Sequence, residues 1–518
     1  MPLFEPQAAY DSIAYPDHAQ RDAHVRQLEA VAVLMGMNPP AVTDCRVLEI
    51  GCATGANLLP QAYDLPESRF VGIDLSPAQI QTANSLAQKL ELGNIDFRAA
   101  DLCDIDASWG LFDYIIAHGV YSWTPPAVRD ALMKVCKQNL APQGVAYVSY
   151  NVLPGWHTRQ AVRHALVYHV QAIDDARKQV EQARSLIEFL SEHGSESAQW
   201  KQQLQGERDF MRGLADGGVF HEHLERDNTP VYFHEFVEHA GRHGLGYIAD
   251  ADLSVNNPQQ IPAKAMATLG NLPRERVEQY VDFLMGRSFR RTLLCHAEAT
   301  RDERIDTDRL RGLFVAAAGA VTTTDFGIDR SAPVEIAIAP HAIRVADPLI
   351  KAVFAQLASI YPAAITLEEL HEKAVGRLPV AMRGGQQGTS AVESVGPVIL
   401  SAALHGMLML SRHAPQCCVQ IAHRPIASAV ARIQAQDVSD VTNRRHCLTR
   451  LDATARFVIG LLDGRHDVHM IVDKVERAVR KGTLSIQASD GRPAGTGAIL
   501  TVFERMLEGF AQSALLVG

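Results

Sequence analysis

Two glycines bracket a tight turn in the segment VLEIGCATGAN, Val47 to Asn57, directly after an apolar stretch that predicts a buried strand. Gly51 and Gly55 lack a Cβ, so the backbone can approach a ligand closely, and the helix expected to follow offers free N–H groups at its start. Glu49 lies in the strand just before the turn. The spacing Gly51-x-x-x-Gly55 departs from the G-x-G-x-x-G fingerprint of dinucleotide sites, which counts against NAD. An ordinary strand-to-helix turn is the alternative.

Carboxylates follow the next two predicted strands. Asp74 closes the segment FVGID, 23 residues after Gly51, and Asp101 follows the segment FRAA. A carboxylate at the first position can accept hydrogen bonds from the two hydroxyls of a ribose, and one at the second can accept from an adenine amino group. Either residue could instead be a helix cap. Three acceptors, with Glu49, at three successive strand ends favour a nucleoside site over three unrelated caps.

The segment HGVYSW, His118 to Trp123, places a histidine and two aromatic residues at the end of the apolar run Tyr114 to Ala117. Ligands in open α/β sheets bind at the carboxyl ends of the strands, so we expect this loop to contact one. Tyr121 and Trp123 are separated by one residue, and both rings would face the same side if the loop is extended. Packing of both rings under the loop is the alternative.

Alternating strand and helix patterns predict the elements that position these residues. The alternation indicates parallel strands with crossover helices. The expected strands are CRVLEIG, SRFVGIDL, NIDFRAAD, FDYIIAHG and GVAYVSYN, and the expected helices cover residues 18–36, 57–63, 77–90 and 127–139. Residues 158 to 225 are charged and helical, which predicts an insertion. A helix and two strands between residues 231 and 297 would then complete the sheet, with a further helix over residues 272 to 286.

The last third of the chain contains a faint internal repeat. One copy reads VFAQLASIYPAAITLEELHEKAV and VGPVILSAALHGMLML, and the other reads ARFVIGLLDGRHDVHMIVDKVERAV and AILTVFERMLEGFAQSALL. Each is helix, turn, helix, gap and apolar helix, which is a winged-helix-like pattern. The third helix of each copy is nearly free of Lys and Arg, which argues against DNA binding. A helical scaffold or partner surface is the expected role.

Composition excludes several classes of protein. The chain has 518 residues, 47% of them apolar and 21% charged, with a formal net charge of −10. Several soluble domains are expected, and the acidic balance argues against a nucleic-acid partner. No segment resembles a signal peptide or is long enough to span a membrane. Eight cysteines without a C-x-x-C pair suggest a reducing cytoplasm.

No metal site is expected. The segment HEFVEH resembles the zinc motif H-E-x-x-H, but Glu238 stands where the second histidine should be. Four further histidines nearby are expected to be surface and packing residues: His221, His223, His239 and His243.

The motifs together resemble those of the bacterial class I S-adenosylmethionine-dependent methyltransferases that carry a methyltransferase regulatory domain. The resemblance rests on YDSIAYP, VLEIGCATGANLLPQA, FVGIDLS, FDYIIAHGVYSWTPPAVRD and VSYNVLPGW, on FHEHLERDNTPVYFHEFVEHAGRHGLGYIADADL as the regulatory domain, and on SFRRTLLCH as its end. It covers residues 8 to 300 well and the remainder more loosely. This group includes the rickettsial protein-lysine methyltransferases that modify outer membrane proteins.

The resemblance implies a Rossmann-like seven-stranded α/β sheet with a helical insertion, and a mainly helical, winged-helix-like C-terminal region. We expect five parts: an N-terminal arm and helix covering the cofactor (1–40), an S-adenosylmethionine-binding core (41–157), the insertion (158–230), the remainder of the sheet (231–300), and a region with two winged-helix-like repeats (301–518).

The resemblance also implies roles for single residues. Ala53 replaces the middle glycine of the family's E-x-G-x-G-x-G turn. Two tyrosines of the N-terminal arm would fold over S-adenosylmethionine, Tyr10 and Tyr15. The other residues expected to line this cofactor are Glu49, Gly51, Cys52, Gly55, Asn57, Asp74, Leu75, Asp101 and His118.

For methyl transfer, His118, Tyr121 and Trp123 would form the mouth of the pocket. Their aromatic faces would hold the sulfonium and a methylammonium product by cation–π attraction. Burial beside the sulfonium would lower the pKa of a lysine amine. His118 would act as a base, or else have a packing or cofactor-contact role. The opposite wall would come from Tyr150, Asn151 and Trp156.

The expected function is lysine methylation of a protein substrate, with an outer membrane protein as one candidate, in the cytoplasm and without nucleic acid or membrane insertion. Two alternatives stay open: a small-molecule N- or O-methyltransferase, and a non-catalytic scaffold that keeps the cofactor site. The oligomeric state also stays open, a homodimer included.

Overall fold

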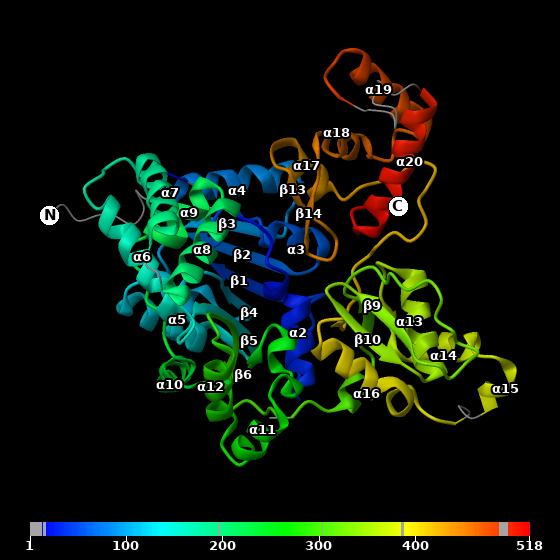
Figure 1. Ribbon diagram of the computed structural model, residues 1–518, viewed down its shortest axis with the longest axis horizontal. Helices are drawn as coiled ribbons and strands as arrows, with labels where there is room; N and C mark the ends of the chain where they lie inside the picture. Colours follow the sequence, from blue (N-terminus) through cyan, green and yellow to red (C-terminus); the bar gives the residue numbers. More distant parts are fainter. Residues whose placement is uncertain (1–12, 14–16, 195–196, 303, 385–387, 486–495) are drawn as a thin grey trace.

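A seven-stranded mixed sheet forms the centre of the computed structural model, which describes residues 13, 17–194, 197–302, 304–384, 388–485 and 496–518 (Figure 1). The strand order is β3-β2-β1-β4-β5-β7-β6. The first five strands run parallel, and β7 is antiparallel to both of its neighbours. Their bounds are β1 Arg46–Ile50, β2 Arg69–Asp74, β3 Ile95–Ala99, β4 Phe112–Ala117, β5 Leu140–Asn151, β6 Leu245–Asp250 and β7 Phe289–His296. The predicted α/β fold is confirmed.

Helices cover both faces of the sheet because its strands are apolar on both sides. Within β4, Tyr114 and Ile116 pack on one face, whereas Ile115 and Ala117 pack on the other, as strand geometry requires. The first face is covered by α2 (Val25–Leu34), α3 (Leu58–Asp64) and α4 (Pro77–Lys89), and the second by α5 (Pro126–Asn139) and α10 (Phe233–Arg242).

The sheet is completed by residues 231 to 297, which confirms that prediction. Strand β7 pairs with β5 from Ala146 to Asn151, and β6 pairs with the far side of β7. The connection between β6 and β7 contains α11 (Ala263–Leu269) and α12 (Arg274–Met285).

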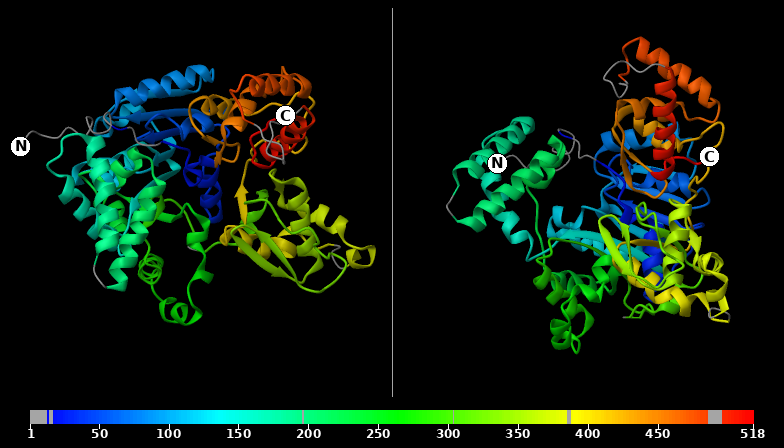
Figure 2. Two further views of the ribbon diagram at one scale, coloured as in Figure 1. Left: turned by 45° about the horizontal axis from the view of Figure 1, so that its top comes forward. Right: turned by 45° about the vertical axis from the view of Figure 1, so that its right-hand side comes forward.

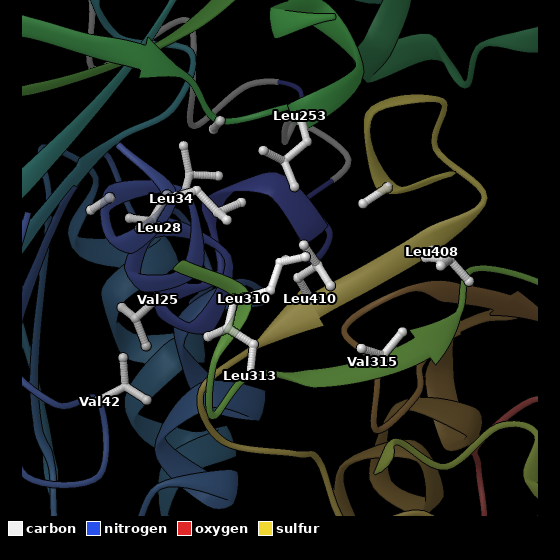
Figure 3. Close-up of a cluster of buried hydrophobic side chains, with 14 of the residues drawn as sticks. Val25, Leu28, Leu34, Val42, Leu253, Leu310, Leu313, Val315, Leu408 and Leu410 are labelled. Carbon is white, nitrogen blue, oxygen red and sulfur yellow. The ribbon is translucent and has the colours of Figure 1, made fainter. Parts of the chain in front are cut away.

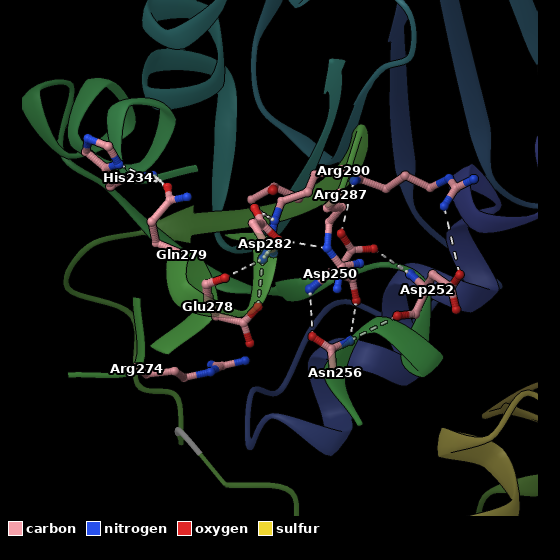
Figure 4. A network of polar contacts seen from close by, with 12 residues as sticks. His234, Asp250, Asp252, Asn256, Arg274, Glu278, Gln279, Asp282, Arg287 and Arg290 are labelled. Carbon is pink, nitrogen blue, oxygen red and sulfur yellow. Dashed lines mark hydrogen bonds and ion pairs between the residues drawn. The ribbon is translucent and has the colours of Figure 1, made fainter. Parts of the chain in front are cut away.

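A buried charge network fixes the outer part of the sheet (Figure 4). Arg290 of β7 is fully buried and donates two hydrogen bonds to Asp282 of α12, at 2.9 and 2.7 Å, and one to Glu278 at 2.9 Å. On the neighbouring strand, Asp250 accepts a hydrogen bond from the Arg291 backbone N–H at 3.1 Å. A buried ion pair that loses one partner costs about 3–5 kcal/mol, so this network ties α12 firmly to the sheet.

The helical insertion projects from the carboxyl end of β5 and has its own small core. It starts at Trp156, two residues earlier than expected. The insertion and the C-terminal region lie on opposite sides of the sheet domain (Figure 2). Its helices are α6 (Trp156–Val170), α7 (Ala176–His193), α8 (Ala198–Gly213), α9 (Asp216–Val219) and the π-helical turn η5 (Phe220–Leu224).

The C-terminal region contains two units with the predicted order of helices. The first comprises β8 (Phe314–Ala317), β9 (Val334–Ile338), β10 (His341–Val345), α13 (Pro348–Ile360), β11 (Ile365–Thr366), α14 (Leu367–Arg377), α15 (Val380–Arg383), α16 (Ala391–Leu404) and β12 (Leu408–Ser411). The second comprises α17 (Ala429–Asp437), β13 (Asp440–Thr442), β14 (Leu448–Arg450), α18 (Ala453–Leu461), α19 (Val468–Arg480) and α20 (Thr496–Gln512).

Helix α2 joins the sheet domain to the first C-terminal unit. Its side chains Val25, Leu28 and Leu34 lie in one continuous cluster with Leu310 and Leu410 (Figure 3). The sheet domain and the first C-terminal unit therefore share one apolar core. Over the part of the chain that is described, no helix is at once long enough and apolar enough to cross a membrane.

A fragment ending at residue 157 should not fold. It would expose the full β5 edge, where residues Ala146 to Asn151 pair with β7, together with the apolar face that α10 covers. We expect an insoluble or uncooperatively melting product, measured by circular dichroism and calorimetry against the full chain. A fragment 1–157 that melts cooperatively and binds S-adenosylmethionine would contradict this.

Candidate active site

The glycine turn after β1 has the backbone conformation that its sequence demands. Gly51 and Gly55 have φ of +74° and +78°, in the left-handed region. A Cβ on Gly55 would lie 2.5 Å from the Phe97 ring, so no side chain fits there. Ala53, where the family has glycine, is also left-handed at φ +48°. Such a residue costs about 1–2 kcal/mol, and its N–H is held by the Asp74 carboxylate at 3.0 Å.

Asp101 caps the 3₁₀ turn that follows it, as the capping alternative predicted, whereas Asp74 is not a helix cap, because Ser76 caps α4. Asp74 accepts from Ala53 and from the Ser76 N–H at 2.9 Å, and Asp101 accepts from the Cys103 N–H at 2.9 Å. A carboxylate offers about four lone-pair sites, so capping leaves room for a ligand. Leu75 beside Asp74 is 46% exposed, as a residue on the open side of the strand ends should be.

Glu49 and Asn57 form a buried pair beneath the turn. The Asn57 Nδ2 donates to Glu49 Oε1 at 2.7 Å, and burial raises the pKa of Glu49 to about 8. Among the described residues, Glu49 Oε2 has no hydrogen-bond partner. A buried acceptor left open in this way is costly, and it fits a ligand that brings a donor or a positive charge. Cys52, also in the turn, is buried and its thiol pKa is raised by burial.

The N-terminal arm reaches this turn through a residue that sequence reasoning missed. Asp17 accepts from the Thr54 hydroxyl at 2.9 Å and from the Ala56 N–H at 3.0 Å, and burial raises its pKa. The Gln20 N–H donates to Asn57 Oδ1 at 3.0 Å. Tyr10 and Tyr15, which were expected to cover the cofactor, lie outside the described residues.

The second missed residue is His446, which lies in the turn between β13 and β14. Its Nε2 donates to Asn57 Oδ1 at 2.8 Å across 389 residues of sequence. Burial lowers the pKa of His446 to about 3, so the ring is neutral. The preceding Arg444 forms an ion pair with Asp64 of α3. No local pattern could have revealed this contact, because both partners are ordinary polar residues in their own segments.

The loop HGVYSW is not extended, which corrects the expectation that Tyr121 and Trp123 face the same side. Residues Tyr121–Trp123 form a 3₁₀ turn, η4, in which alternate residues point in different directions. The Tyr121 ring is 3% exposed and packs against Phe236, and its hydroxyl bonds His239 Nδ1 at 2.8 Å. This placement favours the packing alternative for Tyr121. The half-buried Trp123 instead lies edge-on to Trp156, with ring centroids 6.3 Å apart.

His118 lies at the end of β4, where it was expected. Its Nδ1 bonds the Tyr147 hydroxyl at 2.9 Å, and the next residue, Gly119, donates its N–H to Ser149 Oγ at 2.8 Å. Burial, with a contribution from Arg291, lowers the pKa of His118 to about 3. An imidazole of such low basicity is a poor general base at neutral pH.

The three residues expected opposite this loop differ in their surroundings. Tyr150 is buried, stacks on Phe236 at 3.9 Å and bonds Thr292 through its hydroxyl at 2.9 Å. Asn151 donates to Asn228 Oδ1 at 3.2 Å. Trp156 opens α6 next to Trp123. All three are buried, with exposed fractions of 1% for Tyr150, 4% for Asn151 and 2% for Trp156, so they pack in the core around the loop.

Most of the nearby histidines have protein partners. His221 bonds Glu225 at 3.2 Å, His223 bonds Glu207 at 2.7 Å, and His234 bonds Gln279 at 2.9 Å. The segment HEFVEH therefore uses its first histidine for packing on α12.

Three family models match the chain. They are a methyltransferase domain over residues 47–144, a predicted methyltransferase regulatory domain over residues 216–296, and the C-terminal winged helix domain of PKMT over residues 423–515. The methyltransferase match starts just before the glycine turn and includes the loop HGVYSW.

Two Rickettsia prowazekii proteins are similar in sequence. The uncharacterized protein RP789 is 30% identical over an alignment of 534 residues, which covers 98% of this chain and 93% of that protein. The uncharacterized protein RP028 is 34% identical over 233 residues, covering 45% of this chain and 93% of that protein.

The structure of PKMT2 from Rickettsia typhi is similar over nearly the whole chain. It has a TM-score of 0.87 and 27% identity, and covers 97% of this chain and all of that one. The same protein in complex with AdoHcy gives a TM-score of 0.88. The methyltransferase domain and this complex identify S-adenosylmethionine as the cofactor.

Asp74→Ala should weaken S-adenosylmethionine binding while the fold survives. Loss of hydrogen bonds to a charged acceptor is expected to cost about 1.5–3 kcal/mol of binding free energy. Isothermal titration calorimetry measures the affinity for the cofactor. The melting temperature shows separately how much stability is lost with the hydrogen bond from the Ala53 N–H. Asp106→Ala is the matched control, because Asp106 also accepts a backbone N–H, from Ser108 at 2.9 Å, but has no assigned role at the cofactor. Unchanged affinity in Asp74→Ala would remove Asp74 from the cofactor site.

His446→Ala should weaken the cofactor site from a distance. The substitution leaves Asn57 Oδ1 with one donor instead of two, and an under-satisfied buried group costs about 1–3 kcal/mol. We expect lower cofactor affinity and a coupling of about 0.5–3 kcal/mol with Asn57→Ala in a double-mutant cycle. His446→Gln should restore part of the affinity because it keeps a donor.

The control is His423→Ala, which removes an exposed histidine of the same C-terminal unit. If His446→Ala and His423→Ala bind the cofactor equally well, the contact to Asn57 has no role in the site.

Proposed function

Since the chain belongs to the family of S-adenosylmethionine-dependent methyltransferases that carry a methyltransferase regulatory domain, we propose that it methylates lysine side chains of a protein substrate. The similar Rickettsia typhi protein and the matching winged helix domain both carry the name PKMT, which abbreviates protein-lysine methyltransferase. Membership of this family identifies the methyl donor. The lysine acceptor is our proposal.

The observation that carries the acceptor is a wide, open groove at the carboxyl end of β5. Its volume is about 900 Å³, and it runs between α6, α8 and the turn before β7. Residues lining it include Gly155, His157, Arg159, Trp200, Gln203 and Ser288. Small-molecule sites are usually enclosed clefts, whereas a wide, open groove suits a polypeptide segment. Its lining residues Gly155 and His157 flank Trp156 in the sequence, and the Trp156 ring lies edge-on to that of Trp123.

The cofactor would be held by the residues of the glycine turn and the strand ends. Asp74 would accept from ribose hydroxyls and Asp101 from the adenine amino group, while Glu49 Oε2 would take a donor or positive charge of the methionine part. The left-handed turn from Gly51 to Gly55 lets the backbone come close without a side chain in the way. When bound, S-adenosylmethionine supplies an electrophilic methyl group.

The acceptor side must bring in a lysine amine and let it lose its proton. Burial beside a positive charge lowers the pKa of the amine, and the aromatic face of the half-buried Trp123 would stabilise the cationic product. His118 is too weakly basic to take the proton efficiently, since its pKa is about 3. We therefore assign His118 to cofactor contact and expect water in the groove to carry the proton away.

The general test is methyl transfer from tritiated S-adenosylmethionine to a cell lysate that lacks this enzyme, followed by mass spectrometry of labelled proteins. Label on lysines of polypeptides supports the proposal. Label confined to small molecules would replace it with small-molecule methylation, and cofactor binding without any transfer would indicate a scaffold protein.

Trp123→Ala should spare cofactor affinity and lower kcat/KM for the protein acceptor by about 10- to 100-fold. This corresponds to roughly 1–3 kcal/mol of cation–π contact and positioning. Calorimetry with S-adenosylmethionine and initial rates with the labelled acceptor measure the two effects on one preparation.

Trp109→Ala is the matched control, because Trp109 is also half-buried but lies under Arg98, away from the groove. It should cost stability without changing kcat/KM of the folded fraction. If Trp123→Ala behaves in the same way, Trp123 is a packing residue and the acceptor pocket lies elsewhere.

A further inference from the structure

Three metal-ligating side chains meet where α5 packs beside α10. His239 Nε2 lies 2.7 Å from Asp130 Oδ1, and His243 Nε2 lies 3.5 Å from the same oxygen. One ligand atom from each of the three residues lies within 4.8 Å of the other two. None of these contacts belongs to the cofactor site or to the groove.

Helix geometry explains why the two histidines converge. His239 lies in α10 and His243 caps its C-terminus, so they are four residues apart and share one face. Their ring centroids are 5.2 Å apart. Asp130 comes from α5 and reaches the same point from the opposite side. In the motif H-E-x-x-H, His234 would need a second histidine at position 238, which is Glu238. The two histidines that do converge are His239 and His243, which have the same spacing of four residues.

We propose that Asp130, His239 and His243 bind one divalent transition-metal ion, with Zn²⁺ as the best match. Imidazole nitrogens and a carboxylate oxygen are the usual protein ligands of Zn²⁺. Bonds of about 2.0–2.1 Å in a tetrahedron place neighbouring ligand atoms about 3.3 Å apart. The two distances to Asp130, 2.7 and 3.5 Å, bracket that spacing, and all three ligand atoms lie within 4.8 Å of one another, so side-chain rotations can bring them to it.

The site has an open side and a closed side. The Asp130 side chain is 64% exposed and His243 is 25% exposed, which leaves a coordination position to water. His239 is 9% exposed and faces inward. Asp130 belongs to the segment that matches the methyltransferase domain, and both histidines belong to the segment that matches the regulatory domain. One ion would therefore bridge the two.

Metal binding would reverse a hydrogen bond to the loop HGVYSW. Without an ion, the Nε2–H of neutral His239 donates to Asp130, and Nδ1 accepts from the Tyr121 hydroxyl. With Nε2 bound to the ion, the ring proton must be on Nδ1, which then donates to the Tyr121 oxygen. The neutral ring keeps one proton in both states. Tyr121 is thus an outer partner of the ion, and the loop is coupled to the occupancy of the site.

Calorimetry of the metal-free full chain with ZnCl₂ tests the proposal directly. We expect one ion per chain, at least ten-fold weaker binding in Asp130→Asn and in His243→Ala, and a higher melting temperature for wild type with Zn²⁺. His169→Ala is the control, because it removes an exposed histidine of α6 and should leave binding unchanged. His243 and Asp130 are exposed enough for both variants to fold.

A second measurement uses nuclear magnetic resonance of protein with ¹⁵N-labelled histidine. The His239 signal, assigned with His239→Gln, should change from the Nε2–H to the Nδ1–H tautomer on adding Zn²⁺. Wild type that binds no Zn²⁺, or binds it only as tightly as Asp130→Asn and His243→Ala do, would overturn the proposal. These readouts use the metal alone, so their failure would leave the proposed methyl transfer untouched.

Discussion

The buried side-chain amide of Asn57 is the contact on which the arrangement of the cofactor end depends. Its Nδ2 donates to Glu49 of β1, and its Oδ1 accepts from Gln20 of the N-terminal arm and from His446 of the second C-terminal unit. An amide with both ends committed has one orientation only, since exchanging oxygen and nitrogen would set donors against donors. The glycine turn is thereby fixed by residues from the first and last parts of the chain.

The two C-terminal units contact the sheet domain near the cofactor end through a few specific residues. Helix α2 carries the apolar contact to the first C-terminal unit, and the turn 443–447 carries the polar contact of the second. Arg444 pairs with Asp64, which also pairs with Arg26 of α2 at 3.6 Å. Buried charges of this kind are stabilising only when every partner is present, so the C-terminal region is expected to be part of the cofactor site and not an appended module.

The two aromatic residues of the loop HGVYSW, Tyr121 and Trp123, have different surroundings. Tyr121 points into the core and connects through His239 to α10, whereas the half-buried Trp123 lies edge-on to Trp156. The 3₁₀ turn makes this division, because successive residues in it differ by about a third of a rotation. One end of a single short segment therefore anchors the regulatory segment while the other lies beside the proposed acceptor site.

The features that the sequence determined by itself depend on interactions between residues that are close together in the chain. The five parallel strands, the completion of the sheet by residues 231 to 297, the left-handed glycine turn and the acids at the strand ends all follow from hydrophobic periodicity and backbone sterics within a few residues. The tertiary structure decided which side chains meet. Asp17 and His446 reach the turn from outside its domain, and His239 and His243 gain Asp130 across two helices. Tyr121 faces inward although its spacing suggested otherwise. Such pairings depend on how separate elements pack, and packing energy is shared among many contacts that no short motif encodes.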